Sequence, residues 1–96
     1  SDAETMLNYI NENAVLPATV SIITKPGCPY CTQAKNSLMQ QGWSYEEISL
    51  GRDATLKSVR AITGRETVPQ IFINGEHIGG SEELQAYLDK AEKNAA

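Results

Sequence analysis

The pattern of hydrophobic and polar positions along the chain predicts helices and strands in alternation. Residues 3–14 are polar with one apolar side, which indicates an amphipathic helix. Residues 19–25 are rich in β-branched side chains and predict a strand buried on both faces. Residues 29–41 predict a helix that ends before Gly42, and the alternating residues 45–50 predict a second strand.

A third helix is expected between Asp53, which would cap its first turn, and Gly64, which would end it. Apolar residues recur at every third position of this segment and predict one buried stripe. The residues of the stripe are Leu56, Val59 and Ile62.

The rest of the chain predicts a hairpin followed by a helix. Residues 70–73 form a short apolar strand, and Asn74-Gly75 is the dipeptide preferred in a two-residue type I′ turn. Residues 76–78 would be the return strand, and Ser81 would cap the last helix. The inward-facing residues of that helix would be Leu84, Tyr87 and Leu88.

The resulting order of elements, α-β-α-β-α-β-β-α, defines an α/β fold. A strand, a crossover helix and a second strand form a right-handed parallel pair, and the last two strands form an antiparallel hairpin. We therefore expect a four-stranded mixed sheet flanked by helices on both faces. Residues 19–96 would form this single domain, and residues 1–18 an N-terminal helix or linker segment.

Charge and hydropathy exclude several classes of protein. The chain carries 12 acidic against 8 basic residues, a net charge of −4, which argues against nucleic acid as a partner. No apolar run approaches the roughly 20 residues of a membrane span, and no signal peptide is visible. We therefore expect a cytoplasmic protein with no membrane partner, and in that reducing compartment a pair of nearby cysteines is more often catalytic than structural.

The two cysteines of the chain, Cys28 and Cys31, directly follow the first predicted strand. Their spacing places both sulfurs on one side of a first helical turn, and a CxxC pair beside a βαβ pattern is typical of a redox motif. Cys28 would cap the helix, with Pro29 at its first position. The helix N-terminus and the nearby cation Lys25 favour the thiolate of Cys28. Cys28 is therefore expected to attack, and Cys31 to resolve.

Three other uses of the cysteine pair compete with redox catalysis. A structural zinc site needs four ligands, and Cys28, Cys31 and His77 are at most three; His77 is expected instead to be a strand residue near the surface. A structural disulfide between adjacent turns closes too short a loop to stabilise much. An iron–sulfur cluster bridging two chains would need an outside thiol such as glutathione. Dithiol redox chemistry is favoured, and no metal is expected.

Three motifs of the chain resemble those of dithiol glutaredoxins. They are TKPGCPYC at residues 24–31, TVPQIFING at residues 67–75 and IGGSEEL at residues 78–84. Three motifs in this order and spacing are far more specific than a CxxC pair alone. The resemblance covers about residues 19–88, and residues 53–62 are also similar to glutaredoxin domains fused to bacterial peroxiredoxins.

The resemblance implies a thioredoxin-like fold, glutathione as the co-substrate, and a cis peptide bond between Val68 and Pro69. A cis bond there would leave the backbone of Val68 free to pair with glutathione as an added strand. The start of the last helix would bind the γ-glutamyl carboxylate, and Glu82 would face the γ-glutamyl ammonium group. The glutathione-binding residues implied are Lys25, Tyr30, Thr67, Val68, Pro69, Gly80, Ser81 and Glu82.

The chain departs from the family pattern at three positions. Ser81 and Glu82 stand where the family often has cysteine and aspartate, so an extra thiol is absent and the carboxylate reaches further. Leu56 stands where a polar or basic residue often grips the glycine carboxylate of glutathione. Lys57 and Arg60 are the open alternatives for that contact.

The expected function is glutathione-dependent reduction of protein disulfides and glutathione mixed disulfides through the redox-active pair Cys28 and Cys31. The expected partners are glutathione and disulfide-bonded or glutathionylated proteins, a peroxiredoxin among them, and the chain is expected to be a monomer. Three alternatives stay open. They are an iron–sulfur cluster carrier, a thioredoxin-like reductant fed by a flavoprotein reductase, and a reductant domain for a tethered peroxiredoxin.

Overall fold

The computed structural model describes residue 17 and residues 19–95, and the helix expected over residues 3–14 lies outside them. Among the helices of this described part, none has both the length and the apolar character that crossing a membrane requires. The elements are, in chain order, β1 (Val20–Thr24), α2 (Pro29–Gln40), β2 (Glu46–Ser49), α3 (Leu56–Thr63), β3 (Gln70–Ile73), β4 (Glu76–Gly79) and α4 (Ser81–Ala95).

The four strands form one mixed sheet in the order β2-β1-β3-β4. β1 pairs parallel with β2 and antiparallel with β3, and β3 pairs antiparallel with β4. The turn between β3 and β4 has both central residues at positive φ, 54° at Asn74 and 80° at Gly75, as a type I′ turn requires. The predicted crossover and hairpin are thus both confirmed.

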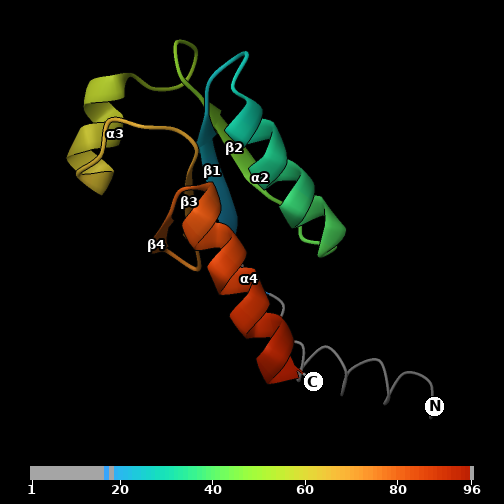
Figure 1. The fold of residues 1–96 in the computed structure, drawn as a ribbon. Helices are drawn as coiled ribbons and strands as arrows, with labels where there is room; N and C mark the ends of the chain where they lie inside the picture. Colours follow the sequence, from blue (N-terminus) through green and yellow to red (C-terminus); the bar gives the residue numbers. More distant parts are fainter. Residues whose placement is uncertain (1–16, 18, 96) are drawn as a thin grey trace, which may run out of the picture.

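The main hydrophobic core lies on the face of the sheet that α2 and α4 cover, whereas α3 lies on the other side (Figure 1). Ile22 and Ile71 point to this core from neighbouring strands, and neither has any exposed surface. Leu38 of α2 and Leu84 of α4 are equally deeply buried. Burial of each such side chain stabilises the fold by roughly 1.5–3 kcal/mol. The core therefore holds the start of α2 firmly beside the carboxyl end of β1.

The ends of α2 follow the sequence prediction. Cys28 is the N-cap, Pro29 is the first helical residue, and Gly42 follows the C-cap with a φ of 75°. A positive φ suits glycine because it has no β-carbon to clash. The reactive pair is thus placed by helix-capping chemistry that is local in sequence.

The starts of the other two helices differ from the prediction. Thr55, not Asp53, caps α3, because the Thr55 hydroxyl oxygen accepts a hydrogen bond from the Ser58 N–H at 3.3 Å. Asp53 instead accepts a hydrogen bond from the N–H of Ser49, since the loop folds back onto the end of β2. Ser81 is the first residue of α4 rather than its cap.

The predicted apolar stripe of α3 is also wrong. Val59 has no exposed surface, but the side chains of Leu56 and Ile62 are exposed, with 46% and 64% of their surface accessible. Each step of three residues rotates the side chain by about 60° around a helix, so the first and last members lie about 120° apart. Only the middle member of the stripe meets the sheet.

Candidate active site

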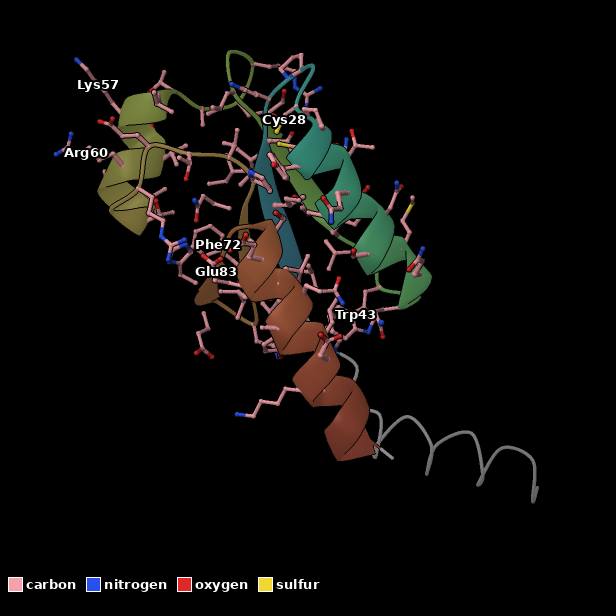
Figure 2. The ribbon with its side chains drawn as sticks, in the orientation of Figure 1. Cys28, Trp43, Lys57, Arg60, Phe72 and Glu83 are labelled. Atoms are coloured by element: carbon pink, nitrogen blue, oxygen red, sulfur yellow. The ribbon has the colours of Figure 1, made fainter. Side chains whose placement is uncertain are left out.

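The two cysteines lie at the start of α2. Figure 2 shows Cys28 at the end of the molecule where the loops gather. The sulfur of Cys28 accepts a hydrogen bond from the backbone N–H of Cys31 at 3.2 Å. Both side chains are buried and unbridged, and Cys28, at 8% exposed, is the more accessible of the two. The pair can therefore form a disulfide, with Cys28 as the sulfur that a partner reaches first.

Burial distinguishes Cys31 from Cys28 chemically. Desolvation, reinforced by the hydrogen bond to Cys28, raises the pKa of the Cys31 thiol from its usual value of 9.0 to about 11. A backbone hydrogen bond from Lys25 and, to a smaller extent, the charge on Lys35 oppose this rise in the pKa without cancelling it. Because the thiolate is the nucleophile, Cys31 is a poor nucleophile at neutral pH, which leaves Cys28 as the attacking thiol.

The loop before β3 faces Cys28. The peptide bond between Val68 and Pro69 is cis, as the resemblance implied. The carbonyl oxygen of Val68 lies 3.9 Å from the sulfur of Cys28, close enough for a weak contact with the thiol. This loop and the start of α2 together form the immediate surroundings of the reactive sulfur.

Two adjoining cavities meet at this loop, and Thr67 and Val68 line both of them. The larger, of about 610 Å³, opens toward β2 and α3, and the smaller, of about 340 Å³, opens toward α4. The sequence motifs at residues 24–31, 67–75 and 78–84 are thus brought to one groove. All eight residues implied as a glutathione site line one cavity or the other: Lys25, Tyr30, Thr67, Val68, Pro69, Gly80, Ser81 and Glu82.

The larger cavity has a wall that the sequence motifs did not include. The wall forms because the backbone N–H of Leu50 bonds to the carbonyl oxygen of Thr24 at 2.8 Å, which carries the loop after β2 to the end of β1. No local sequence signal marks this contact, since it depends on strand pairing. The added wall residues are Leu50, Gly51, Ala54 and Thr55.

The third helix contributes Leu56 to the groove and neither of its cations. Leu56 lines the larger cavity, whereas Lys57 and Arg60 line neither cavity. Figure 2 shows the side chains of Lys57 and Arg60 extending away from the sheet. Arg60 forms an ion pair with Glu66 at 2.8 Å instead. Lys25 is therefore the one cation among the residues that line the larger cavity.

A second charged pair shapes the smaller cavity. Arg65 forms an ion pair with Glu83, and Glu83 also accepts a hydrogen bond from the backbone N–H of Gly80 at 3.2 Å. These contacts, Arg65 first, lower the pKa of Glu83 and keep its carboxylate turned back toward the loop (Figure 2). The neighbouring Glu82 remains exposed at the mouth of the cavity.

Within residues 17 and 19–95, no three histidine, cysteine, aspartate or glutamate side chains gather in a way that could hold a metal ion.

The fold and the site together define a thioredoxin-like protein with a dithiol redox centre. The family model named Glutaredoxin matches residues 20–78, and the chain belongs to the glutaredoxin family of thiol–disulfide oxidoreductases. Glutaredoxins use glutathione as their reductant.

Two curated relatives bear on the family more closely. The chain is 56% identical over 88 residues to hybrid peroxiredoxin hyPrx5 of Haemophilus influenzae, covering 92% of this chain and 36% of that protein. It is 46% identical over 70 residues to Glutaredoxin 3 of Escherichia coli, covering 72% of this chain and 84% of that protein. The chain thus spans about a third of the length of the hybrid protein and matches most of the length of a separate glutaredoxin.

Solved glutaredoxin structures share the fold. Glutaredoxin 1 of Francisella tularensis, complexed with cacodylate, superposes with a TM-score of 0.67 at 35% identity, over 78% of this chain and 96% of that one. The buckwheat glutaredoxin–glutathione complex superposes with a TM-score of 0.68 at 28% identity, over 96% of this chain and 90% of that one.

Proposed function

We propose that the protein reduces glutathione mixed disulfides and disulfides of other proteins, with glutathione as the electron donor. The observation that carries this proposal is the position of Cys28, whose sulfur lies 3.9 Å from the carbonyl oxygen of Val68, a residue common to both cavities. A tripeptide lying along the groove would pass over Val68, the residue whose carbonyl oxygen contacts the reactive sulfur. The buckwheat relative, solved as a glutathione complex, supports glutathione as the ligand.

For a glutathionylated protein, the Cys28 thiolate attacks the sulfur of the bound glutathione. A new S–S bond joins Cys28 to glutathione, and the protein thiolate leaves and takes up a proton. A second glutathione, as its thiolate, attacks the glutathione sulfur, releases oxidised glutathione and restores the Cys28 thiolate. This cycle leaves Cys31 unused, in keeping with its raised pKa.

For a protein disulfide, both cysteines take part. Cys28 attacks one sulfur of the substrate and forms a mixed disulfide. Cys31 then attacks Cys28, its proton passes to the departing substrate thiolate, and a Cys28–Cys31 disulfide remains. Two glutathione molecules reduce that disulfide. Their pool lies near the potential of glutaredoxins, roughly −200 to −230 mV.

Lys25 and the start of α4 suit the two carboxylates of glutathione, and Glu66, which also lines the larger cavity, is paired with Arg60. Lys25 in the larger cavity would face the glycine carboxylate, and the start of α4 at Ser81 would face the γ-glutamyl carboxylate. Glu82 would face the γ-glutamyl ammonium group. Among the described residues, the backbone N–H of Val68 has no hydrogen-bond partner, so it can pair with the peptide of glutathione.

The experiment that tests this function measures turnover of a glutathionylated peptide by the wild type and by the Cys28→Ser and Cys31→Ser variants. We expect Cys28→Ser to be inactive, and Cys31→Ser to stay active and to accumulate one glutathione adduct by mass. A wild type unable to use glutathione would exclude this function. Turnover with a flavoprotein reductase would then support a thioredoxin-like reductant, and a brown colour after anaerobic purification an iron–sulfur carrier.

We also propose a peroxiredoxin as a physiological substrate. The support is the 56% identity to a hybrid peroxiredoxin of which this chain spans 36%. Its test is peroxide reduction by the peroxiredoxin part of such a hybrid, produced without the part that matches this chain, with glutathione and this protein as the sole reductants. Removal of the Cys28 thiol should stop that reaction.

The proposed chemistry also sets the expected location and state. A dithiol that equilibrates with reduced glutathione belongs in a reducing compartment, which supports the cytoplasm. We also expect a monomer, which light scattering of the purified protein would test.

A further inference from the structure

One polar side chain of the sheet has no exposed surface, and the proposed chemistry leaves it without a role. Gln70 opens β3 and is 0% exposed. Its amide nitrogen donates to the backbone carbonyl of Thr67 at 3.0 Å and to the Thr67 hydroxyl oxygen at 3.1 Å. Its amide oxygen lies 2.7 Å from the ring nitrogen Nε2 of His77. Burial of an amide is costly unless both of its ends are satisfied, as they are here.

The pairing of strands places His77 next to Gln70. His77 of β4 lies opposite Phe72 of β3, and their rings are 5.1 Å apart between centroids. Gln70 is two residues before Phe72 and therefore on the same face of the sheet. The contact between His77 and Gln70 spans the register shift that the β3–β4 pair has between Ile71 and Phe72.

The three groups fix one another's direction. The carbonyl of Thr67 can only accept, so the amide nitrogen of Gln70 must point to it and the amide oxygen must point to His77. His77 must then carry a hydrogen on Nε2, in its neutral and in its charged form alike. A His77 ring with a bare Nε2 would face the amide oxygen lone pair to lone pair.

The same chain of bonds sets the direction of the Thr67 hydroxyl. Because this oxygen accepts a hydrogen bond from Gln70, its own hydrogen is left to point elsewhere. Thr67 lines both cavities and directly precedes Val68, whose carbonyl faces the sulfur of Cys28. A reversed amide at Gln70 would accept the Thr67 hydrogen and withdraw it from the groove.

We propose that His77 and Gln70 are positioning residues, which orient the Thr67 hydroxyl as a hydrogen-bond donor toward the ligand in the groove. The proposal rests on the proposed function, since glutathione is the ligand that Thr67 would meet. His77 acts indirectly, because it contacts Gln70, and Gln70 contacts Thr67. Neither residue touches the cysteines.

The test compares KM and kcat for a glutathionylated peptide among variants of the chain. Gln70→Glu keeps the acceptor for His77 but cannot donate to Thr67, and His77→Phe keeps the ring against Phe72 but loses the donor. Loss of one hydrogen bond to the ligand should raise KM about five- to tenfold, with kcat little changed. His77→Gln presents an amide N–H in place of Nε2–H and should restore KM.

The controls separate positioning from stability. Leu88→Ala truncates a buried core side chain of α4 that lines neither cavity, and it should lower stability without raising KM. In a Thr67→Val background, His77→Phe should add nothing to KM, because the coupling passes through the Thr67 hydroxyl. Nitrogen NMR of the wild type should show the His77 ring with its hydrogen on Nε2.

The outcomes differ from those that decide the proposed function. No turnover of the peptide by the wild type overturns the function and this proposal together. Turnover by the wild type with unchanged KM in Gln70→Glu and His77→Phe overturns the positioning proposal alone. Additive effects of His77→Phe and Thr67→Val, or a His77 ring with a bare Nε2, do the same.

Discussion

The sulfur of Cys28 accepts a hydrogen bond from the backbone N–H of Cys31, at 3.2 Å. One contact thus caps the helix and holds the two sulfurs on the same turn. The helix N-terminus is an anion-binding site, and in this protein the group that fills it is the sulfur proposed to attack. Cys31 supplies the N–H but lies deeper, where burial keeps its own thiol protonated.

Alkylation should distinguish the two thiols. At about pH 7, iodoacetamide should modify Cys28 first, because burial raises the pKa of Cys31 to about 11 and leaves almost no Cys31 thiolate. In the Cys28→Ser variant, the rate at Cys31 should increase as the pH rises well above 9. Mass spectrometry of peptides gives both rates. Equal rates at the two cysteines at neutral pH would contradict the unequal roles.

Replacement of the cation in the larger cavity should weaken glutathione binding. Lys25→Met should raise KM for a glutathionylated peptide about threefold, the effect of one exposed charge pair. Lys57→Met is the matched control, since Lys57 is exposed and lines neither cavity. The increase in KM with Lys25→Met should also shrink at high salt. A larger increase in KM with Lys57→Met than with Lys25→Met would mean that the glycine carboxylate of glutathione contacts α3 and not Lys25.

A methyl group at Gly79 should disturb the smaller cavity. Gly79 has a φ of 127°, and a β-carbon there would lie 2.6 Å from the Glu83 carboxylate oxygen. Gly79→Ala should therefore lower the free energy of unfolding by roughly 1–3 kcal/mol and also raise KM. Gly42→Ala is the control, because Gly42 has a positive φ of 75° and open space around it. Urea denaturation of Gly79→Ala with and without Glu83→Ala separates backbone strain from the clash with Glu83.

Acid should weaken a polar contact between the first two strands. Glu47 accepts a hydrogen bond from Thr24 at 2.5 Å and forms an ion pair with Lys35 at 3.2 Å. These contacts, Thr24 first, lower the pKa of Glu47 below its usual 4.5. The stabilisation by these contacts is therefore fully present above pH 4.5 and is lost as the pH falls through the lowered pKa of Glu47.

Thr24→Val should consequently cost about 1 kcal/mol of unfolding free energy near neutral pH, and less in acid. Urea midpoints of the wild type and the variant on both sides of pH 4.5 measure the difference. A difference that stays constant with pH would mean that Glu47 draws no stability from Thr24.

The fold was largely predictable because its signals are short-range. β3 has the predicted bounds, the hairpin turn lies at Asn74 and Gly75, and α2 begins after Cys28. Each of these depends on the conformation of a few consecutive residues. The errors concern the starts of α3 and α4 and the exposed face of α3. At the start of α3, Asp53 and Thr55 are both good caps, and only the path of the loop decides between them.

The sequence by itself determined the order of helices and strands along the chain, the position of Cys28 at the start of a helix, and the motifs that identify a glutaredoxin. The tertiary structure alone decided which residues share the groove. It brought the loop after β2 to Lys25 and kept Lys57 away. It also joined His77, expected near the surface of its strand, through Gln70 to Thr67. The physical reason is that caps and turns depend on neighbouring residues, whereas a groove and a buried polar chain depend on which strands pair and in what register.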